Sequence, residues 1–339
     1  MSKTRLLFIA NPISGTRSKE PVVASLPQFL DSERFEWQVE WTDHRGHAAE
    51  LAQTAARNDV DVCVAIGGDG TVNEVARSLR HTQTALAIVP MGSGNGLARH
   101  LQIPMDPDGA LRVLAECRVQ ALDYGLINDF PFFCTCGMGF DAFISERFSS
   151  AGKRGLGTYI EKALQDGLNY KPETYEVEMD GQTELHNAFL IACGNASQYG
   201  NNFQIAPQAS MSDGLLDVTI MEPFGMLKAP QIVMQMLRGT LDKNPAIHTY
   251  QCRSLHVRRT QPGVIHYDGE PAEAGTDIDI RLVPGGLRVV VNELQSRPKE
   301  PVEHIFQDLY DQITGDIKSQ QRKLLAINKE LLNRLLQRS

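Results

Sequence analysis

A carboxylate stands alone in a glycine-rich turn of this 339-residue sequence. The turn is Gly67-Gly68-Asp69-Gly70-Thr71, which follows the apolar run 60–66 and precedes a helical pattern. Glycine lets the backbone approach a ligand closely, and the free N–H groups at the start of a helix attract anions. A carboxylate there would repel phosphate unless a cation lay between. We therefore predict that Asp69 interacts with the Mg²⁺ of a bound nucleotide. The alternative is that Asp69 only caps the helix.

Two further glycine loops follow short apolar runs. Gly92-Ser93-Gly94-Asn95-Gly96 comes after the run 85–89, and the loop 10–16, which contains Asn11, comes after the run 5–10. Neither loop matches the dinucleotide pattern G-x-G-x-x-G, and the chain has no Walker A motif. Three such loops at strand ends indicate a cradle for a nucleotide triphosphate that lacks a P-loop lysine.

A second pair of carboxylates lies in the turn Asp268-Gly269-Glu270. Phosphoryl transfer to a hydroxyl needs positioned phosphates, Mg²⁺ and a base near the nucleophile. A tight turn that holds two carboxylates can chelate a metal or accept a proton. The alternative is a plain hairpin turn, because Asp-Gly is a strong hairpin signal.

The elements that must position these residues change character along the chain. The runs 5–10, 60–66 and 85–89 suit strands buried on both faces, and Val72, Val75, Ala76 and Leu79 mark one face of a helix between them. We therefore expect a doubly wound parallel α/β domain over residues 1–122. Residues 123–292 read as a β-rich, sandwich-like domain, with helices at 157–168 and 225–241 and last strands that can return to the first domain.

Residues 293–339 are predicted to form a linker and an amphipathic helical tail. Ile317, Leu324, Leu331 and Leu335 have heptad-like spacing, and residues 316–339 carry six basic against two acidic residues. Such a helix could lie on a membrane surface or pair with a second subunit. We favour a homo-oligomer, most simply a dimer, because the apolar stripe lacks Trp and Phe.

The motifs at 11–15 (NPISG), 67–75 (GGDGTVNEV) and 92–99 (GSGNGLAR) resemble the catalytic domain of the diacylglycerol kinase family. That family includes bacterial soluble lipid kinases, sphingosine kinases and ceramide kinase. The resemblance continues through Asp123, the segment 210–217 (SMSDGLLD) and the segment 266–270 (HYDGE), and it covers roughly residues 3–292. The GGDGT motif alone is shared with NAD kinases and phosphofructokinases.

The resemblance implies roles for individual residues. It implies that Glu270 is the general base, supported by Asp268, and that Asp213 binds a structural Mg²⁺ with the backbone carbonyls of Ser210 and Leu215. Asp69 and Asp123 would join an Asp–water–Mg²⁺ network. The residues that would line the ATP site are Asn11, Thr42, Gly67, Gly68, Asp69, Gly70, Thr71, Val72, Asn73, Glu74, Gly92, Ser93 and Asn95.

Two positions depart from the family pattern. Bacterial diacylglycerol kinases typically have Asp where this chain has Gly96, and a run of glycines where it has Gly200-Asn201-Asn202. The first departure bears on which lipid is the acceptor, and the second on the shape of the turn.

The overall composition narrows the classes of partner. Apolar residues make up 42% of the chain, charged residues 22%, and the formal net charge is −8, which disfavours nucleic acid as a partner. We expect the six cysteines to be reduced, buried thiols of a cytoplasmic protein, because no signal peptide or membrane span is evident. The nine histidines show no spacing typical of a zinc site, and we expect none.

The sequence therefore predicts an ATP- and Mg²⁺-dependent lipid kinase that associates peripherally with a membrane during turnover. Its acceptor would be a hydroxyl of a diacylglycerol-like or sphingoid-like lipid. One alternative is a kinase for NAD or another soluble alcohol, and a second is a non-catalytic, nucleotide-binding adaptor.

Overall fold

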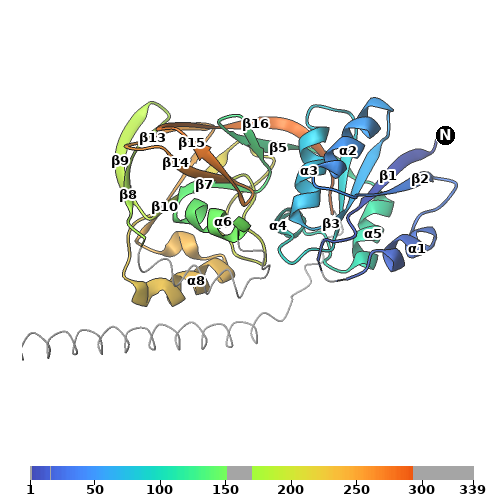
Figure 1. The fold of residues 1–339 in the computed structure, drawn as a ribbon, viewed down its shortest axis with the longest axis horizontal. Coiled ribbons are helices and arrows are strands. Elements are labelled where there is room, and N and C mark those ends of the chain that lie inside the picture. Colours follow the sequence, from blue (N-terminus) through green and yellow to red (C-terminus); the bar gives the residue numbers. More distant parts are fainter. Residues whose placement is uncertain (1, 16, 151–169, 293–339) are drawn as a thin grey trace, which may run out of the picture.

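The computed structural model describes residues 2–15, 17–150 and 170–292. Two domains lie side by side, and the long strand β16 (Asp277–Val290) runs along both of them (Figure 1). The predicted α/β and β-rich domains are confirmed. The predicted helix at 157–168 and the predicted tail at 293–339 lie outside the described residues.

The first domain alternates strands and helices. Its sheet has the order β2-β1-β3-β4 with every pair parallel. Helices α1 and α5 pack together, as do α2 and α3, so that the sheet is doubly wound. The strands are β1 (Thr4–Ala10), β2 (Phe35–Trp41), β3 (Val62–Gly67) and β4 (Ala85–Pro90), and the helices are α1 (Glu20–Phe29), α2 (His47–Arg57), α3 (Asp69–Leu79), α4 (Gly96–His100) and α5 (Pro107–Glu116).

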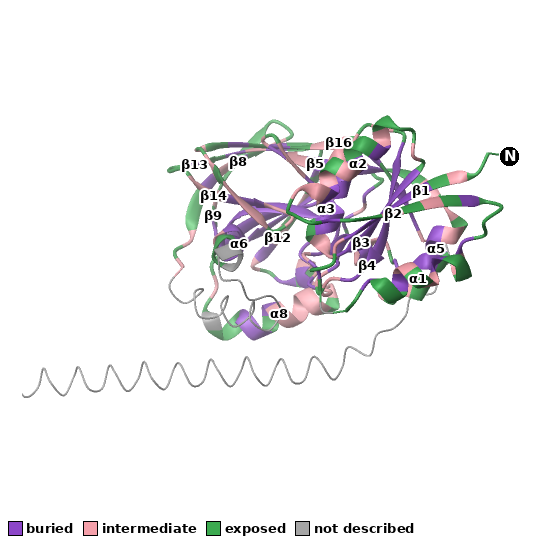
Figure 2. Cartoon of the chain, turned by 45° about the vertical axis from the view of Figure 1, so that its right-hand side comes forward, coloured by how far each residue is buried: buried purple, intermediate pink, exposed green. Residues whose placement is uncertain are grey.

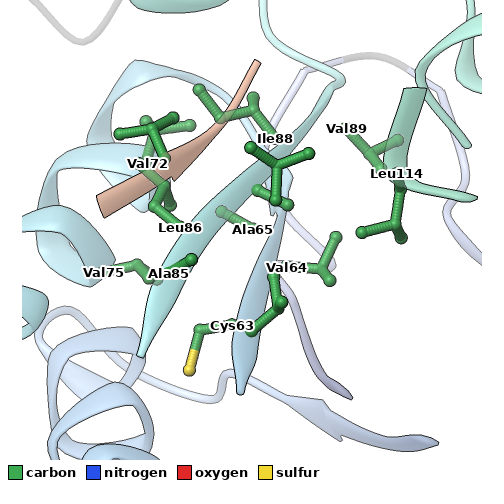
Figure 3. Packing of buried hydrophobic residues seen from close by; sticks show 14 of the residues in the cluster. Cys63, Val64, Ala65, Val72, Val75, Ala85, Leu86, Ile88, Val89 and Leu114 are labelled. Atoms are coloured by element: carbon green, nitrogen blue, oxygen red, sulfur yellow. The ribbon is translucent and has the colours of Figure 1, made fainter. Parts of the chain in front are cut away.

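The central strands of this domain are buried from end to end. Every residue of β3 and β4 is buried, as expected for parallel strands covered on both faces. Val72 and Val75 of α3 pack onto one face, and Leu114 of α5 lies in the same core (Figure 3). The edge strand β2 is only partly buried, with a pattern in which buried and exposed positions mix. The core thus fixes the strand ends from which the glycine loops leave.

The second domain is a sandwich of two sheets. A six-stranded antiparallel sheet has the order β12-β11-β10-β7-β14-β15, and it faces the β13-β8-β9 end of the larger sheet. The strands are β5 (Val119–Ile127), β6 (Phe130–Phe132), β7 (Thr135–Gly139), β8 (Glu173–Met179), β9 (Gln182–Ala188), β10 (Leu190–Gly194), β11 (Leu216–Met221), β12 (Ile247–Cys252), β13 (Ser254–Arg259), β14 (Gly263–Tyr267) and β15 (Glu270–Ala274).

Among the described residues, two helices cover the outer face of the six-stranded sheet. They are α6 (Phe140–Ser150) and α8 (Ala229–Arg238), and short 3₁₀ turns at Met226–Lys228 and Leu241–Lys243 flank α8. A second apolar cluster, which includes Phe140, Phe189 and Ile232, fills the space beneath them. Figure 2 shows that burial concentrates in the strands of both domains.

Strand β16 joins the two domains through a bulge. Its first residues, Asp277–Arg281, pair with β13, the stretch from Ile280 to Val290 pairs with β5, and Val289 lies beside Leu86 of β4. The register shifts between Val283 and Leu287, where Gly285 adopts a φ of 58°. A bulge bends its strand and re-aims it, so this one redirects β16 from the sandwich into the parallel sheet. Leu122 and Asp123, where we predicted the domain boundary, both lie within β5.

The remaining expectations concern cysteines and membrane spans. All six cysteines are free, and all but Cys117 are buried. Among the described residues, none of the helices has the length and apolarity to cross a membrane.

At Gly286, in the bulge of β16, the neighbouring Tyr124 ring leaves no room for a side chain. A Cβ on Gly286 would lie 2.4 Å from Cε1 of Tyr124, a buried ring whose hydroxyl bonds Nε2 of His81 at 3.0 Å. We expect Gly286→Ala to lower the free energy of unfolding by about 1–3 kcal/mol, the usual range for overpacking. Urea unfolding measures this loss. The matched control is Gly275→Ala, whose Cβ meets nothing within 4 Å; equal losses in the two variants would contradict the argument.

Candidate functional site

The three glycine loops lie together at the carboxyl ends of neighbouring parallel strands. Backbone hydrogen bonds join them in pairs, from Asn11 N to the Ile66 carbonyl (3.1 Å) and from Met91 N to the Gly67 carbonyl (2.8 Å). A Cβ on Gly92 would lie 2.6 Å from the Cα of Gly68. The glycines therefore let two loop backbones touch directly, and no side chain separates them.

Asp69 joins the glycine loop 67–71 to the glycine loop 92–96. Its Oδ2 accepts the N–H of Asn95 at 2.8 Å and its Oδ1 accepts the N–H of Gly96 at 2.7 Å. Burial raises the pKa of Asp69, and the same two hydrogen bonds oppose that rise. The N-cap of α3 is Gly68, and Asp69 makes no side-chain capping bond, so the capping alternative is wrong. Asp69 is thus a brace between loops.

The polar side chains of the loops divide into those that shape the backbone and those that face outward. Asn95 has a φ of 52°, and its amide bonds both N and O of Gly92 (3.1 and 2.9 Å). Asn11 donates from Nδ2 to Oγ1 of the buried Thr71 at 3.1 Å. Ser93 is exposed at the tip of its loop. Ser93 is thus the most open of these side chains, Asn11 is half-buried, and Asn95 is buried.

The remaining predicted ATP-site residues surround α3. Val72 lies in the core (Figure 3), so a ligand could reach only its backbone. Asn73 and Thr42 are buried, and Thr42 N donates to the Ala10 carbonyl at 2.9 Å. Glu74 accepts the N–H of Gly46 through Oε1 at 3.0 Å, which anchors the loop after β2 onto α3.

Asp268 and Glu270 play different parts although they share one turn. The turn is a hairpin between β14 and β15, with Asp268 and Gly269 at φ values of 50° and 80°. The Asp268 carboxylate accepts three backbone N–H groups, those of Phe133, Cys134 and Thr135, at 2.7–3.0 Å. Burial raises the pKa of Asp268, and these hydrogen bonds oppose the rise. Asp268 is therefore a second loop brace.

Glu270 points across to the first domain. Its Oε2 accepts a hydrogen bond from Nη1 of Arg77 on α3 at 3.2 Å, and its Oε1 lies 3.7 Å from Nη2 of Arg45. The Glu270 side chain is 29% exposed, so a ligand can reach it. The arrangement brings a reachable carboxylate of the second domain to α3, the helix that begins at the glycine loop 67–71.

Arg77 is a site residue that the sequence reasoning missed. Its guanidinium carbon lies 4.9 Å from the ring centre of Tyr267, and its Nε and Nη2 are buried without a hydrogen-bond partner in the described residues. Such donors carry a desolvation cost that an arriving anion would relieve. The available signal was spacing, since Arg77 stands four residues after Asn73 and thus on the same face of α3.

The predicted metal residues lie at the turn before β11. Asp123 accepts the N–H of Gly214 (3.0 Å) and of Gly285 (2.7 Å), so it braces this turn against β16. The exposed Asp213 accepts the N–H of Leu215 at 3.0 Å, and Ser210 and Ser212 stand 3.4 Å apart through their hydroxyls. The turn itself is formed by Asp213-Gly214, with Gly214 at a φ of 77°.

Asp217 is a candidate metal ligand that the sequence analysis did not name, and one of its oxygens has no hydrogen-bond partner in the described residues. Burial raises its pKa to about 6, and the nearby charge of Asp213 adds to the rise against a hydrogen bond from Gln251. Its Oδ2 is buried without a hydrogen-bond partner in the described residues. Two carboxylates four residues apart in sequence, one of them with an unsatisfied oxygen, offer the hard oxygen donors that Mg²⁺ prefers.

A loop of the second domain sits directly on the second glycine loop. Asn201 N donates to the Gly94 carbonyl at 3.0 Å, and Ser197 N donates to Nδ1 of His100 at 3.1 Å. Burial lowers the pKa of His100 to about 4, so the ring is neutral and can accept this bond. We name residues 197–202 the latch loop.

A buried cluster connects the latch loop to the strand that precedes Asp268. Tyr199 Oη donates to Oδ2 of Asp141 at 3.0 Å, and Nε2 of His266 bonds the same oxygen at 2.9 Å. His266 and Asp141 are both almost fully buried. The position of the Asp268–Glu270 turn is therefore coupled to the glycine loop through fixed side chains.

A parallel α/β domain with glycine loops at its strand ends, joined to a β-sandwich that carries a reachable carboxylate, is the arrangement expected of a phosphotransferase. Residues 5–127 match the diacylglycerol kinase catalytic domain, and residues 134–291 match the YegS C-terminal NAD kinase beta sandwich-like domain. This chain belongs to the diacylglycerol kinase family, and it is a kinase of the lipid kinase class.

Individual relatives agree with that assignment. A protein of Chromohalobacter salexigens named "Probable lipid kinase YegS-like" is 31% identical over 73% of this chain and 81% of its own length. The "Diacylglycerol kinase" of Staphylococcus saprophyticus is 27% identical over 79% and 89%. A crystal structure of a diacylglycerol kinase from Bacillus anthracis str. Sterne covers 87% of this chain and 100% of its own, with 20% identity and a TM-score of 0.66, and thus has the same fold.

The brace made by Asp69 can be tested by amide exchange. We expect Asp69→Asn to speed hydrogen exchange at the Asn95 and Gly96 amides and to lower the free energy of unfolding by about 1–3 kcal/mol, because the amide turns a donor toward a backbone N–H. Exchange measured by NMR or mass spectrometry reads this out. The exposed Asp108→Asn serves as the control. Wild-type exchange at Asn95 and Gly96 in the Asp69 variant would contradict the assignment.

Proposed function

We propose that this chain uses ATP and Mg²⁺ to phosphorylate a hydroxyl of a membrane lipid, diacylglycerol-like or sphingoid-like. The observation that carries the proposal is the Arg77–Glu270 contact, which places a reachable carboxylate of the β-rich domain against α3. Helix α3 begins at the glycine loop 67–71, so a nucleotide held there would present its terminal phosphate toward the second domain.

Each step of the transfer has a group on this chain to perform it. The N–H groups of the glycine loops and the start of α3 would hold the phosphates of ATP. The acceptor oxygen forms a bond to the γ-phosphorus while the bond to the β–γ bridging oxygen breaks, and ADP leaves. The hydroxyl proton passes to Glu270. Arg77 orients that carboxylate through its hydrogen bond and has further N–H groups for phosphate oxygens.

The proposed reaction involves Mg²⁺ in two roles, one structural and one carried by the nucleotide. Asp213 and Asp217 have the donor set for a structural Mg²⁺ at the turn before β11, with the carbonyls of Ser210 and Leu215 nearby in sequence. A nucleotide brings its own Mg²⁺, which neutralises phosphate charge during transfer. Asp69 and Asp123 would act on either ion only through water, because backbone N–H groups already occupy both oxygens of each carboxylate.

The acceptor requires work at a membrane surface, and we propose that the protein binds there peripherally during turnover. The tail at 293–339, whose membrane-binding and dimer-forming alternatives stay open, lies outside the described residues. Purified protein with Mg²⁺ and labelled ATP would be offered diacylglycerol, monoacylglycerol, ceramide, a sphingoid base and phosphatidylglycerol in separate mixed micelles, with NAD in a parallel tube.

One labelled lipid supports the proposal and names the acceptor. Labelled NADP would instead favour an NAD kinase, which shares the sandwich architecture of the second domain. ATP binding without any product would favour a nucleotide-binding adaptor. Replacing ATP by GTP in the productive tube gives the nucleotide preference.

The role of Glu270 predicts a kinetic defect. We expect Glu270→Gln to lower kcat at least about 100-fold with little change in ATP affinity, because a general base contributes about 10²–10⁴-fold. Turnover and nucleotide binding are measured on the same preparation. The control is Glu273→Gln, an exposed change on the same strand. Near-normal turnover in the Glu270 variant would remove this residue from the mechanism.

The carboxylate pair at the predicted metal site makes a prediction about stability. A raised pKa means that the folded state resists ionisation of Asp217, so its contribution to stability falls as pH rises from about 4 to 6. At about pH 8 with a chelator, we expect Asp217→Asn to melt at a higher temperature than wild type. Added Mg²⁺ should stabilise wild type and leave the variant unchanged. Equal Mg²⁺ shifts in both proteins would place the ion elsewhere.

A further inference from the structure

Three potential metal ligands gather on the loop between β2 and α2, outside the groups used above. They are Asp43, His44 and His47, and their ligand atoms all lie within 4.8 Å of one another. Nδ1 of His47 lies 2.8 Å from Oδ1 of Asp43, and Nδ1 of His44 contacts the same oxygen. We propose that this trio is a binding site for a transition-metal dication such as Zn²⁺.

The geometry favours a single ion held by all three groups. The two imidazole rings are stacked, with centres 4.8 Å apart and planes within 6° of parallel, and Nδ1 of each ring contacts the same oxygen of Asp43. Two nitrogens that converge on one oxygen can converge on an ion placed beside that oxygen. Imidazole nitrogens with a carboxylate are a ligand set for zinc, whereas Mg²⁺ and Ca²⁺ prefer oxygen alone.

The loop that carries the trio is held in place from both sides. Thr42, just before it, bonds β1, and Gly46 bonds Glu74 of α3 at 3.0 Å. His47 is the first residue of α2, so its backbone is fixed by the helix. The ligands thus need only small side-chain rotations to close on an ion, which lowers the entropic cost of binding.

Access and charge also suit a cation. Asp43 is 74% exposed and His47 22%, so an ion can enter and solvent can supply a fourth ligand. Glu50, one helical turn on, lies 3.4 Å from Nε2 of His44 and adds a second carboxylate. Arg45 lies in the same loop, but its guanidinium reaches toward Glu270 at 3.7 Å.

The sequence spacing did not reveal this site because the ligands come from a loop and the first residue of a helix. Among the described residues, no other group of three such side chains meets the same distance criterion. His256 lies between Asp277 (3.4 Å) and Asp279 (2.8 Å) and supplies a single imidazole. It provides a matched control for incidental binding by histidine and carboxylate.

The test measures Zn²⁺ binding to the full-length chain without an affinity tag, by calorimetry in the presence of excess Mg²⁺. We expect one Zn²⁺ site in wild type that His44→Asn and His47→Asn each weaken at least about tenfold. His256→Asn should leave it unchanged. Circular dichroism checks that these changes at exposed or half-buried positions leave the fold intact.

Bound Co²⁺ supplies a second readout, since two imidazoles and a carboxylate should give the absorption of a four-coordinate ion, lost in His47→Asn. Wild-type affinity in both the His44 and His47 variants, an equal loss in His256→Asn, or displacement by Mg²⁺ would each overturn the proposal. Neither readout involves ATP or lipid, so the outcome is independent of the proposed kinase reaction.

Discussion

The hydrogen bonds from two backbone N–H groups to the Asp69 carboxylate are the interaction on which the site depends. They hold the second glycine loop against the first, where the backbones are too close for any side chain to intervene. The same device recurs at Asp268, which accepts three backbone N–H groups, and at Asp123, which accepts two. Hydrogen bonds to a carboxylate are stronger than those between neutral groups. Each carboxylate can therefore fix a loop that has no backbone hydrogen bonds of a helix or sheet.

This use of aspartate separates the carboxylates of the chain into two groups. Aspartates whose two oxygens both accept backbone N–H groups shape loops. By contrast, Glu270 is partly exposed, Asp213 is exposed, and Asp217 has a buried oxygen without a hydrogen-bond partner in the described residues. Glu270 accepts a hydrogen bond from Arg77, whereas burial raises the pKa of Asp217 and the charge of Asp213 adds to that rise. In the proposed reaction the first carboxylate accepts a proton and the second helps to hold a metal ion.

The sequence predicted the two-domain fold well because its signals are local. The strand at Val62–Gly67 and the helix face through Val72 and Leu79 follow directly from apolar runs and 3.6-residue spacing. Edge strand β2 was missed, since its mixed burial leaves no continuous apolar run. The Arg77–Glu270 contact could not be foreseen, because it joins residues 193 positions apart through the packing of two domains. Nor could spacing distinguish a bracing aspartate from a reactive one, since both occupy glycine turns.

The two departures from the family pattern are parts of one contact between the domains. Asn201 and Asn202 adopt φ values of 50° and 63°, and asparagine tolerates this region better than most residues, so the latch loop keeps a turn that glycines would make. That loop presses on Gly96, where a Cβ would lie 3.3 Å from the Tyr199 carbonyl oxygen. An aspartate at Gly96 would bring its carboxylate toward this carbonyl oxygen and weaken the packing of the latch loop against the first domain. Glycine at this position is therefore explained by packing between the domains, and it need not report which lipid the protein phosphorylates.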